Sequence, residues 1–170
     1  MEVGKSSLTY RYINNQFPAV HDDTIIDRIL NLAKIKNKVY KIEILDTEGE
    51  NDFPNMLKQW INFGDGFLLV FSINDKTSFD LLSSKRENII KEKHHESCPM
   101  ILIGNKQDLD NNREVSYDEA KKLAESWNID YLETSAKTNL NCKDAFENLA
   151  VKIYESRPKT KRTSCPCSIY

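Results

Sequence analysis

The chain lacks the dense, regularly spaced cysteines of a disulfide-stabilised domain. Cys98 and Cys142 lie in the body of the chain, and Cys165 and Cys167 lie near the C-terminus. This distribution argues against a disulfide framework and predicts a reduced, cytosolic compartment.

Long apolar runs and an excess of basic residues are also missing. No stretch approaches the roughly 20 apolar residues that a membrane-spanning helix needs, and Met1 is followed by Glu2, Gly4 and Lys5 rather than by the apolar part of a signal peptide. The formal net charge of −2 argues against a nucleic-acid-binding surface. The 170 residues, of which 39% are hydrophobic and 29% charged, fit one ordinary globular domain.

Short apolar runs alternate with helical patterns along the chain. Residues 67–73 (FLLVFSI) are almost wholly apolar, as expected for a strand that is covered on both faces. Residues 77–94 predict one mostly polar helix, and the capping box at residues 116–119 predicts the start of another. Strand and helix alternate, which predicts an α/β layer fold with a mostly parallel sheet. Residues 29–35 and 39–45 predict a hairpin, and therefore one antiparallel edge strand.

The composition changes once, near Ser156. Beyond this residue, four basic residues occur with two prolines and no acidic residue. Such a segment is typical of a flexible basic tail. The sequence therefore predicts a domain over residues 1–155 and a flexible tail over residues 156–170.

Two short motifs have the chemistry of a phosphate and metal site. Residues 4–6 (GKS) open a helical segment, where backbone N–H groups bind phosphate, Lys5 would reach the outer phosphates and Ser6 could ligate Mg²⁺. Residues 46–49 (DTEG) follow a strand, where Asp46 can hold Mg²⁺ through water and the N–H of Gly49 can approach a terminal phosphate. Each motif alone also fits an ordinary turn.

Two further motifs have the chemistry of base recognition. Residues 105–108 (NKQD) follow a strand, and Asp108 could accept hydrogen bonds from N1–H and the 2-amino group of guanine, donors that adenine lacks there. Residues 134–137 (TSAK) follow another strand, and a backbone N–H of this segment could meet the guanine carbonyl. The alternatives are a polar loop for the first motif and a helix N-cap at Ser135 for the second.

The order of these four motifs resembles that of Ras/Rap-type small GTPases of the Ras superfamily, over nearly the whole chain. The resemblance implies a P-loop NTPase-type three-layer fold, GTP or GDP with Mg²⁺ as cofactors, and a guanine-nucleotide-dependent switch in signal transduction. It implies nucleotide binding by Gly4, Lys5, Ser6, Ser7, Phe17, Thr24, Gly49, Asn105, Lys106, Asp108, Ser135, Ala136 and Lys137. It implies Mg²⁺ binding by Ser6 and Thr24, with Asp46 acting through water.

The resemblance also assigns the catalytic positions to Lys5, Thr24, Gly49 and Glu50. Glu50 stands where the family usually has the glutamine that orients the attacking water. A carboxylate accepts a hydrogen bond from that water but cannot donate one to the γ-phosphate. Glu48 adds charge at a position where alanine is usual. We therefore expect slow intrinsic hydrolysis and a weak response to an arginine finger.

The beginning of the chain departs from the family pattern. Family members carry a full strand and the first glycines of the phosphate loop ahead of Gly4, whereas here Met1 and Glu2 hold the two positions before Val3. That strand is central in the family sheet, so its loss would leave two neighbouring strands without a partner. The sequence therefore predicts a domain that is truncated within the phosphate loop and lacks its first strand, either as a fragment or because the start is incomplete.

The end of the chain, residues 167–170 (CSIY), resembles a C-a-a-X motif with an unusual final tyrosine. It predicts prenylation of Cys167 and palmitoylation of Cys165, with the basic tail as a further membrane signal. The lipidated protein would lie at the cytoplasmic face of a membrane, and we expect this to be the plasma membrane. A protein with an unmodified tail would be cytosolic.

The resemblance further implies a monomer that meets an exchange factor, a GTPase-activating protein and effectors through its two switch segments. The rival interpretation is a pseudo-GTPase or truncated binding module without nucleotide turnover, and it rests on the shortened phosphate loop and the altered second switch. An ATPase fits poorly, because Asp108 would face adenine groups that donate nothing to it.

Overall fold

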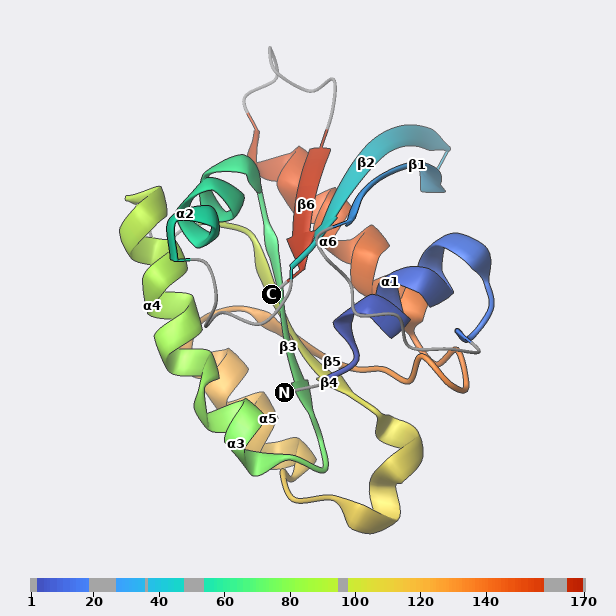
Figure 1. The fold of residues 1–170 in the computed structure, drawn as a ribbon, viewed down its shortest axis with the longest axis vertical. Coiled ribbons are helices and arrows are strands. Elements are labelled where there is room, and N and C mark those ends of the chain that lie inside the picture. Colours follow the sequence, from blue (N-terminus) through green and yellow to red (C-terminus); the bar gives the residue numbers. More distant parts are fainter. Residues whose placement is uncertain are drawn as a thin grey trace.

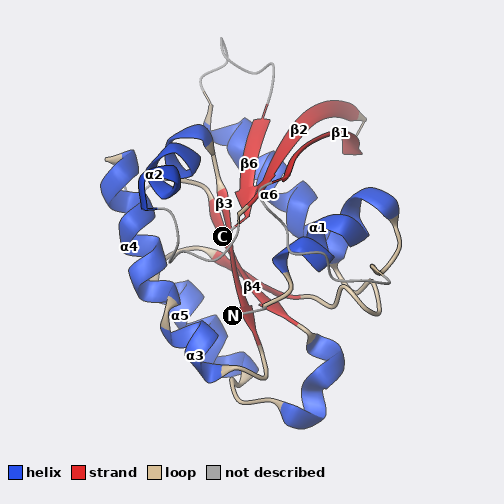
Figure 2. Cartoon of the chain, in the orientation of Figure 1, coloured by secondary structure: helices blue, strands red, loops and turns tan. Residues whose placement is uncertain are grey.

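A computed structural model describes residues 3–18, 27–35, 37–47, 54–94, 98–157 and 165–169. In chain order, the elements are α1 (Lys5–Asn14), β1 (Asp27–Ile35), β2 (Lys38–Asp46), α2 (Pro54–Phe63), β3 (Phe67–Ser72), α3 (Lys76–Asp80), α4 (Leu82–Lys93), β4 (Met100–Asn105), the 3₁₀ helix η1 (Gln107–Asn112), α5 (Tyr117–Ser126), β5 (Asp130–Glu133), α6 (Cys142–Ser156) and β6 (Cys165–Ile169). Helices lie on both sides of one sheet (Figures 1 and 2).

The described strands form one sheet in the order β1-β2-β6-β3-β4-β5. β1 pairs antiparallel with β2, and the other neighbours pair parallel. Asn37 turns the β1–β2 hairpin with a φ of 64°, a left-handed conformation that asparagine adopts more readily than most residues. The predicted α/β fold, with a mostly parallel sheet and one antiparallel edge strand, is therefore confirmed.

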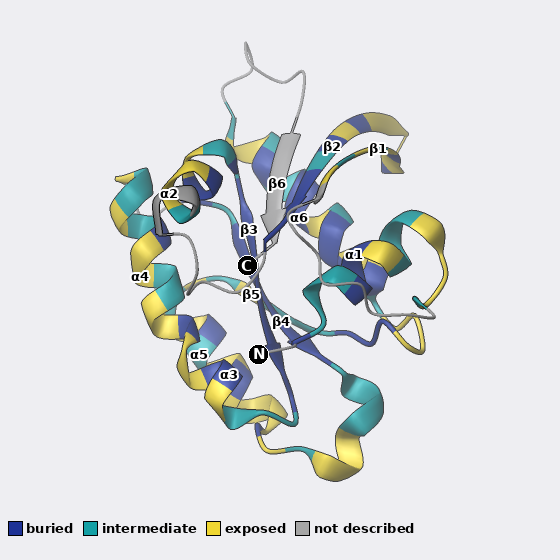
Figure 3. Ribbon diagram, viewed as in Figure 1, coloured by how far each residue is buried: buried dark blue, intermediate teal, exposed yellow. Residues whose placement is uncertain are grey.

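The core lies in two layers because side chains alternate across each strand. On β3, Leu68 and Val70 pack toward α1 and α6, whereas Phe67, Leu69 and Phe71 pack toward α2, α3, α4 and α5. Every residue of β3 and β4 is buried, which Figure 3 shows as dark blue strands in the middle of the molecule. None of the described helices combines the length and the apolar character that crossing a bilayer requires.

The helix predicted over residues 77–94 is interrupted at Leu81, between α3 and α4. The interruption is slight, since Leu81 keeps a helical φ of −74° and its N–H still donates to the carbonyl of Thr77 (3.3 Å). The side chain of Asp75 accepts a hydrogen bond from the N–H of Ser78 (3.1 Å) and so caps the first part.

Part of the segment predicted as a flexible tail over residues 156–170 forms a strand. α6 ends at Ser156, and the backbone of Cys165–Ile169 forms β6 between β2 and β3 (Figure 1). β2 and β3 do not pair with each other, so the N–H and C=O groups that they turn toward the gap need a strand between them. β6 supplies that strand, and the end of the chain thus fills the place where the sequence predicted a missing central strand.

Candidate nucleotide-binding site

The predicted site residues gather at one edge of the sheet. Asp46 ends β2, Asn105 ends β4, and residues 134–137 follow β5 directly. The strands from β2 to β5 run parallel, so these three ends lie on the same side. In open α/β sheets this carboxyl edge is where ligands bind.

Gly4 shapes the part of the edge where α1 begins. Its φ is 86°, and a Cβ built at this position would lie 2.7 Å from Nδ2 of Asn105. Neither the conformation nor the space suits any residue with a side chain. α1 begins directly after Gly4, and backbone N–H groups at the start of a helix are the arrangement that binds phosphate.

Asn105 links the start of α1 to the loop after β5. Its Nδ2 donates to the carbonyls of Val3 (2.9 Å) and Gly4 (3.4 Å), and its Oδ1 accepts from the hydroxyl of Thr134 (3.1 Å). Asn105 and Thr134 are buried, with 1% and 0% of their surface exposed. Asn105 therefore fixes the start of α1, on the phosphate side, relative to the loop after β5, on the base side.

Asp108 and Ser135 meet on the base side. The Ser135 hydroxyl donates to Oδ1 of Asp108 (2.6 Å), and the same oxygen of Ser135 accepts from the N–H of Thr138 (3.1 Å). Nζ of Lys137 lies 4.0 Å from Oδ2 of Asp108. Ser135 thus caps a turn rather than the helix N-terminus of the alternative interpretation, since α6 begins only at Cys142, and it also fixes the carboxylate of Asp108. The carboxylate keeps further acceptor capacity.

A charged cluster that the motifs did not single out stabilises the end of β5. Arg113 forms two hydrogen bonds with the carboxylate of Glu133 (2.7 and 3.0 Å), and the Tyr131 hydroxyl donates to the same carboxylate (2.8 Å). Burial raises the pKa of Tyr131, and the hydrogen bonds to Glu133 and Asp110 raise the pKa of Arg113. Spacing along the sequence gives no signal for this cluster, because Arg113 and Glu133 come from different segments.

Arg11 is a second residue that no motif revealed. It lies on α1, and its Nε donates to the carbonyl of Ala136 (2.7 Å) in the loop after β5. Cys142 supports the same loop from the start of α6, since its Sγ donates to the carbonyl of Ser135 (3.1 Å). Burial raises the pKa of the Cys142 thiol to about 11, so it stays protonated near neutral pH.

The remaining predicted residues divide into described and undescribed ones. Asp46 is buried with 2% of its surface exposed, Lys5 and Ser6 are half-buried, Ser7 is buried, and Phe17 is 43% exposed beyond the end of α1. Lys106 is the N-cap residue before η1 and has a left-handed φ of 65°. Thr24, Glu48, Gly49 and Glu50 lie outside the described residues.

The described residues fit a guanine nucleotide with Mg²⁺. The absence of a Cβ at Gly4 leaves room beside Asn105, which any other residue would fill. The hydroxyl of Ser6 and the carboxylate of Asp46 are the hard oxygen donors that Mg²⁺ prefers. The carboxylate of Asp108 suits the two donors on the guanine edge.

Comparison with known proteins identifies a family model and relatives that match this chain. The model of the Ras family matches residues 1–155. The chain is 38% identical over 176 residues to the Ras-related protein R-Ras of Mus musculus, and the alignment covers 97% of this chain and 81% of that protein. It is 43% identical over 151 residues to the Ras-like protein RAS2 of Hydra vulgaris, covering 89% of this chain and 79% of that protein.

A third relative is the Ras-like protein rasB of Dictyostelium discoideum, at 38% identity over 161 residues, with 95% of this chain and 82% of that protein covered. The family match extends over nearly the whole described domain, and the motifs at the carboxyl edge of the sheet lie within it. The chain therefore belongs to the Ras family of small GTPases.

Proposed function

We propose that this chain binds GDP and GTP with Mg²⁺ at the carboxyl edge of its sheet and acts as a signalling switch that hydrolyses GTP slowly. The observation that carries the proposal is the set of hydrogen bonds made by Asn105, which donates to the carbonyls of Val3 and Gly4 and accepts from the hydroxyl of Thr134. These bonds join the phosphate side to the base side. A nucleotide spans these two sides, so their fixed relation favours one ligand that contacts both.

On the phosphate side, the N–H groups that follow Gly4 would face phosphate oxygens, and Lys5 would add a positive charge. Ser6 and Thr24 would hold Mg²⁺ directly, with Asp46 behind it through water. Bound Mg²⁺ neutralises charge on the phosphate oxygens. Ser7 and Gly49 complete the proposed phosphate contacts.

On the base side, Asp108 would accept from N1–H and the 2-amino group of guanine. Ser135 holds this carboxylate in place (2.6 Å), and N–H groups of Ala136 and Lys137 would meet the guanine carbonyl. Adenine would leave the carboxylate without donors, which costs free energy and excludes it. Asn105, Lys106 and Phe17 would complete the base and ribose contacts.

Hydrolysis is the step in which this chain departs from its family. Glu50 holds the position of the water-orienting residue and cannot donate a hydrogen bond to the γ-phosphate, and Glu48 adds negative charge nearby. We expect a Glu50→Gln variant to hydrolyse GTP faster than the parent chain in single-turnover measurements. An unchanged or lower rate would argue that this side chain does not limit hydrolysis.

Partner binding and membrane attachment are the broader part of the proposal. As a monomeric switch, the chain would meet an exchange factor, a GTPase-activating protein and effectors through its two switch segments. Lipids on Cys167 and Cys165 would anchor it to a membrane. The backbone of both cysteines lies in β6, so modification would require this strand to leave the sheet.

The direct test is the nucleotide content of the chain purified with Mg²⁺. After denaturation, we expect guanine nucleotide close to one molecule per chain and no adenine nucleotide. A folded protein without nucleotide would instead support the rival function, a binding module without turnover. Glu48 and Glu50 are the residues that favour this second function, because their negative charges would repel the phosphates.

A further inference from the structure

Arg11 lies near the C-terminal end of α1 and forms hydrogen bonds with the loop that follows β5. Its Nε donates to the carbonyl of Ala136 (2.7 Å), and its Nη2 donates to the carbonyl of Lys137 (3.0 Å). Its Nη1 donates to the carbonyl of Asn15 at the end of its own helix (3.0 Å). One guanidinium therefore ties three backbone carbonyls together, two of which belong to a loop about 125 residues away in sequence.

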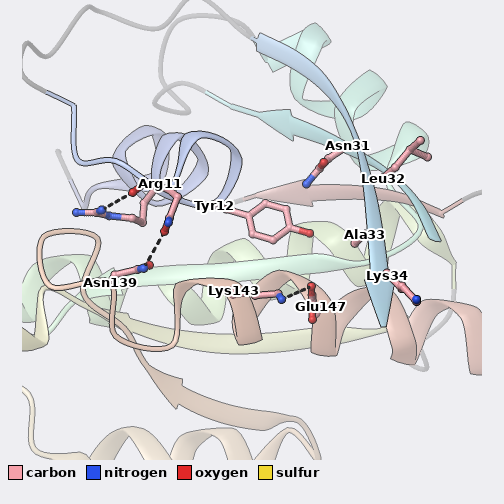
Figure 4. Close-up of a pocket in the computed structure, with 10 residues that line it drawn as sticks. Arg11, Tyr12, Asn31, Leu32, Ala33, Lys34, Asn139, Lys143 and Glu147 are labelled. Carbon is pink, nitrogen blue, oxygen red and sulfur yellow. Dashed lines mark hydrogen bonds and ion pairs between the residues drawn. The ribbon is translucent and has the colours of Figure 1, made fainter. Parts of the chain in front are cut away.

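A second contact lies beside the first. Nδ2 of Asn139 donates to Oδ1 of Asn15 (3.0 Å), so the same end of α1 holds the loop at another point. Figure 4 shows Arg11 and Asn139 on one side of a pocket of about 430 Å³ that lies between α1, β1 and α6. None of the residues that line this pocket belongs to the predicted nucleotide set, so Arg11 grips the loop from outside the proposed site.

The hydrogen bonds from Arg11 also set the orientation of the peptide units in this loop. In a trans peptide, the C=O and the following N–H point to opposite sides of the chain. Arg11 holds the carbonyl of Ala136, which turns the N–H of Lys137 away from α1. It also holds the carbonyl of Lys137, and the next N–H, that of Thr138, donates to the hydroxyl of Ser135 (3.1 Å).

We propose that Arg11 is a positioning residue that fixes the orientation of the loop at residues 134–137 and thereby slows the release of guanine nucleotide. The inference rests on the proposed function, because it takes this loop to be the segment whose N–H groups meet the guanine carbonyl. Through Arg11 and Asn105, both ends of α1 are then bonded to the base side of the site. A shift of α1, which begins beside the proposed phosphate site, would then also shift the loop at residues 134–137.

The first experiment measures dissociation of a fluorescent GDP analogue from Arg11→Met, which keeps an unbranched apolar stem but has no hydrogen-bond donor. We expect dissociation about tenfold faster than from the parent chain, the factor for losing roughly one charge-assisted hydrogen bond. The association rate should change little, because the loop contacts act after encounter. Arg11→Lys keeps the charge with a single donor group and should restore part of the residence time.

The matched control is Arg86→Met. Arg86 lies on α4, on the other face of the sheet, and its guanidinium lies 5.2 Å from the ring centre of Trp127. Its loss removes an arginine without touching the loop, so the dissociation rate should stay close to that of the parent chain. Dissociation that is equally fast in both variants, or unchanged in Arg11→Met, would overturn the proposal.

A second measurement tests Arg11 without relying on bound nucleotide. Ser135 and Leu140 exchange two backbone hydrogen bonds of 3.1 Å across the loop, and amide hydrogen exchange reports their opening. We expect faster exchange at these two amides in Arg11→Met than in Arg86→Met or the parent chain. Unchanged exchange would refute the positioning role itself, whereas faster exchange in a chain that binds no guanine nucleotide would refute only the proposed function.

Discussion

Asn105 donates a hydrogen bond from its buried side-chain amide to the backbone carbonyl of Val3 (2.9 Å), across 102 positions of the sequence. The other end of the same amide accepts from the hydroxyl of Thr134 (3.1 Å). All three segments are closed to water at this point, so each group depends on the others for its hydrogen bond. Asn105 therefore joins the start of α1 to the loop after β5 within the proposed site.

Replacing Asn105 with alanine should lower both stability and nucleotide retention. The substitution leaves the carbonyl of Val3 and the hydroxyl of Thr134 buried without their partner, which costs about 1–3 kcal/mol of unfolding free energy. Urea unfolding measures this loss. Asn112→Ala, at an exposed position in η1, is the control and should change stability little. Equal stability of the two variants would contradict the linking role.

The base side gives a prediction on specificity. Asp108→Asn replaces an acceptor with a donor on the base side, so guanine nucleotide should bind much more weakly. Xanthine carries a carbonyl in place of the 2-amino group, and we expect the variant to gain affinity for xanthosine diphosphate. Competition binding with both nucleotides measures the exchange. A variant that still prefers guanine would show that Asp108 does not read the base.

The sequence predicted the parts of the structure that depend on local pattern. Apolar runs such as residues 67–73 became buried strands, and the polar motifs fell at strand ends, because alternating elements force a layered sheet. The contacts of Arg11 and Arg113 could not be predicted in this way. Each arginine reaches a segment that only the tertiary fold brings near, and neither position carries a periodic signal.

The strand at the end of the chain was missed for a related reason. Residues 165–169 (CPCSI) contain a proline, which lacks the N–H of a strand ladder and argues against a central strand. The pairing comes instead from β2 and β3, whose facing backbone groups are left without partners unless a strand enters between them. That requirement belongs to the whole sheet and is not encoded in the five residues.

The position of β6 predicts the effect of removing it. A chain that ends at residue 164 loses the partner of Ile42–Asp46 in β2 and of Phe67 and Leu68 in β3. We expect a clear fall in the thermal midpoint and faster amide exchange in both strands, because backbone groups in the middle of the sheet lose their hydrogen bonds. Replacing the four basic residues between 157 and 162 with glutamine is the control for the loss of tail charge, and a truncation that melts like the full chain would support a flexible tail instead.

Two buried thiols predict a loss of stability in alkali. Burial raises the pKa of Cys98 and of Cys142 from the ordinary 9.0 to about 11. The folded chain therefore holds these protons more tightly than the unfolded chain, so the contribution to stability is complete below pH 9 and is lost as the pH rises through 11. Denaturant unfolding between pH 8 and 11 measures the slope. A variant with alanine at both positions should show a shallower slope, and an identical slope would rule out the thiols as its cause.

The close approach of Gly4 and Asn105 can be separated into steric and conformational parts by a double-mutant cycle. Gly4→Ala has two effects. The added Cβ would lie 2.7 Å from Nδ2 of Asn105, and the alanine would have to adopt a φ of 86°, which is strained for a residue with a side chain. In the Asn105→Ala background the clash disappears and only the strain remains. Gly4→Ala should therefore cost less stability there than in the parent chain, by an interaction energy of about 0.5–3 kcal/mol. Additive losses in urea unfolding would mean that the backbone at residue 4 moves away from Asn105 and that the tight packing at the start of α1 is not required.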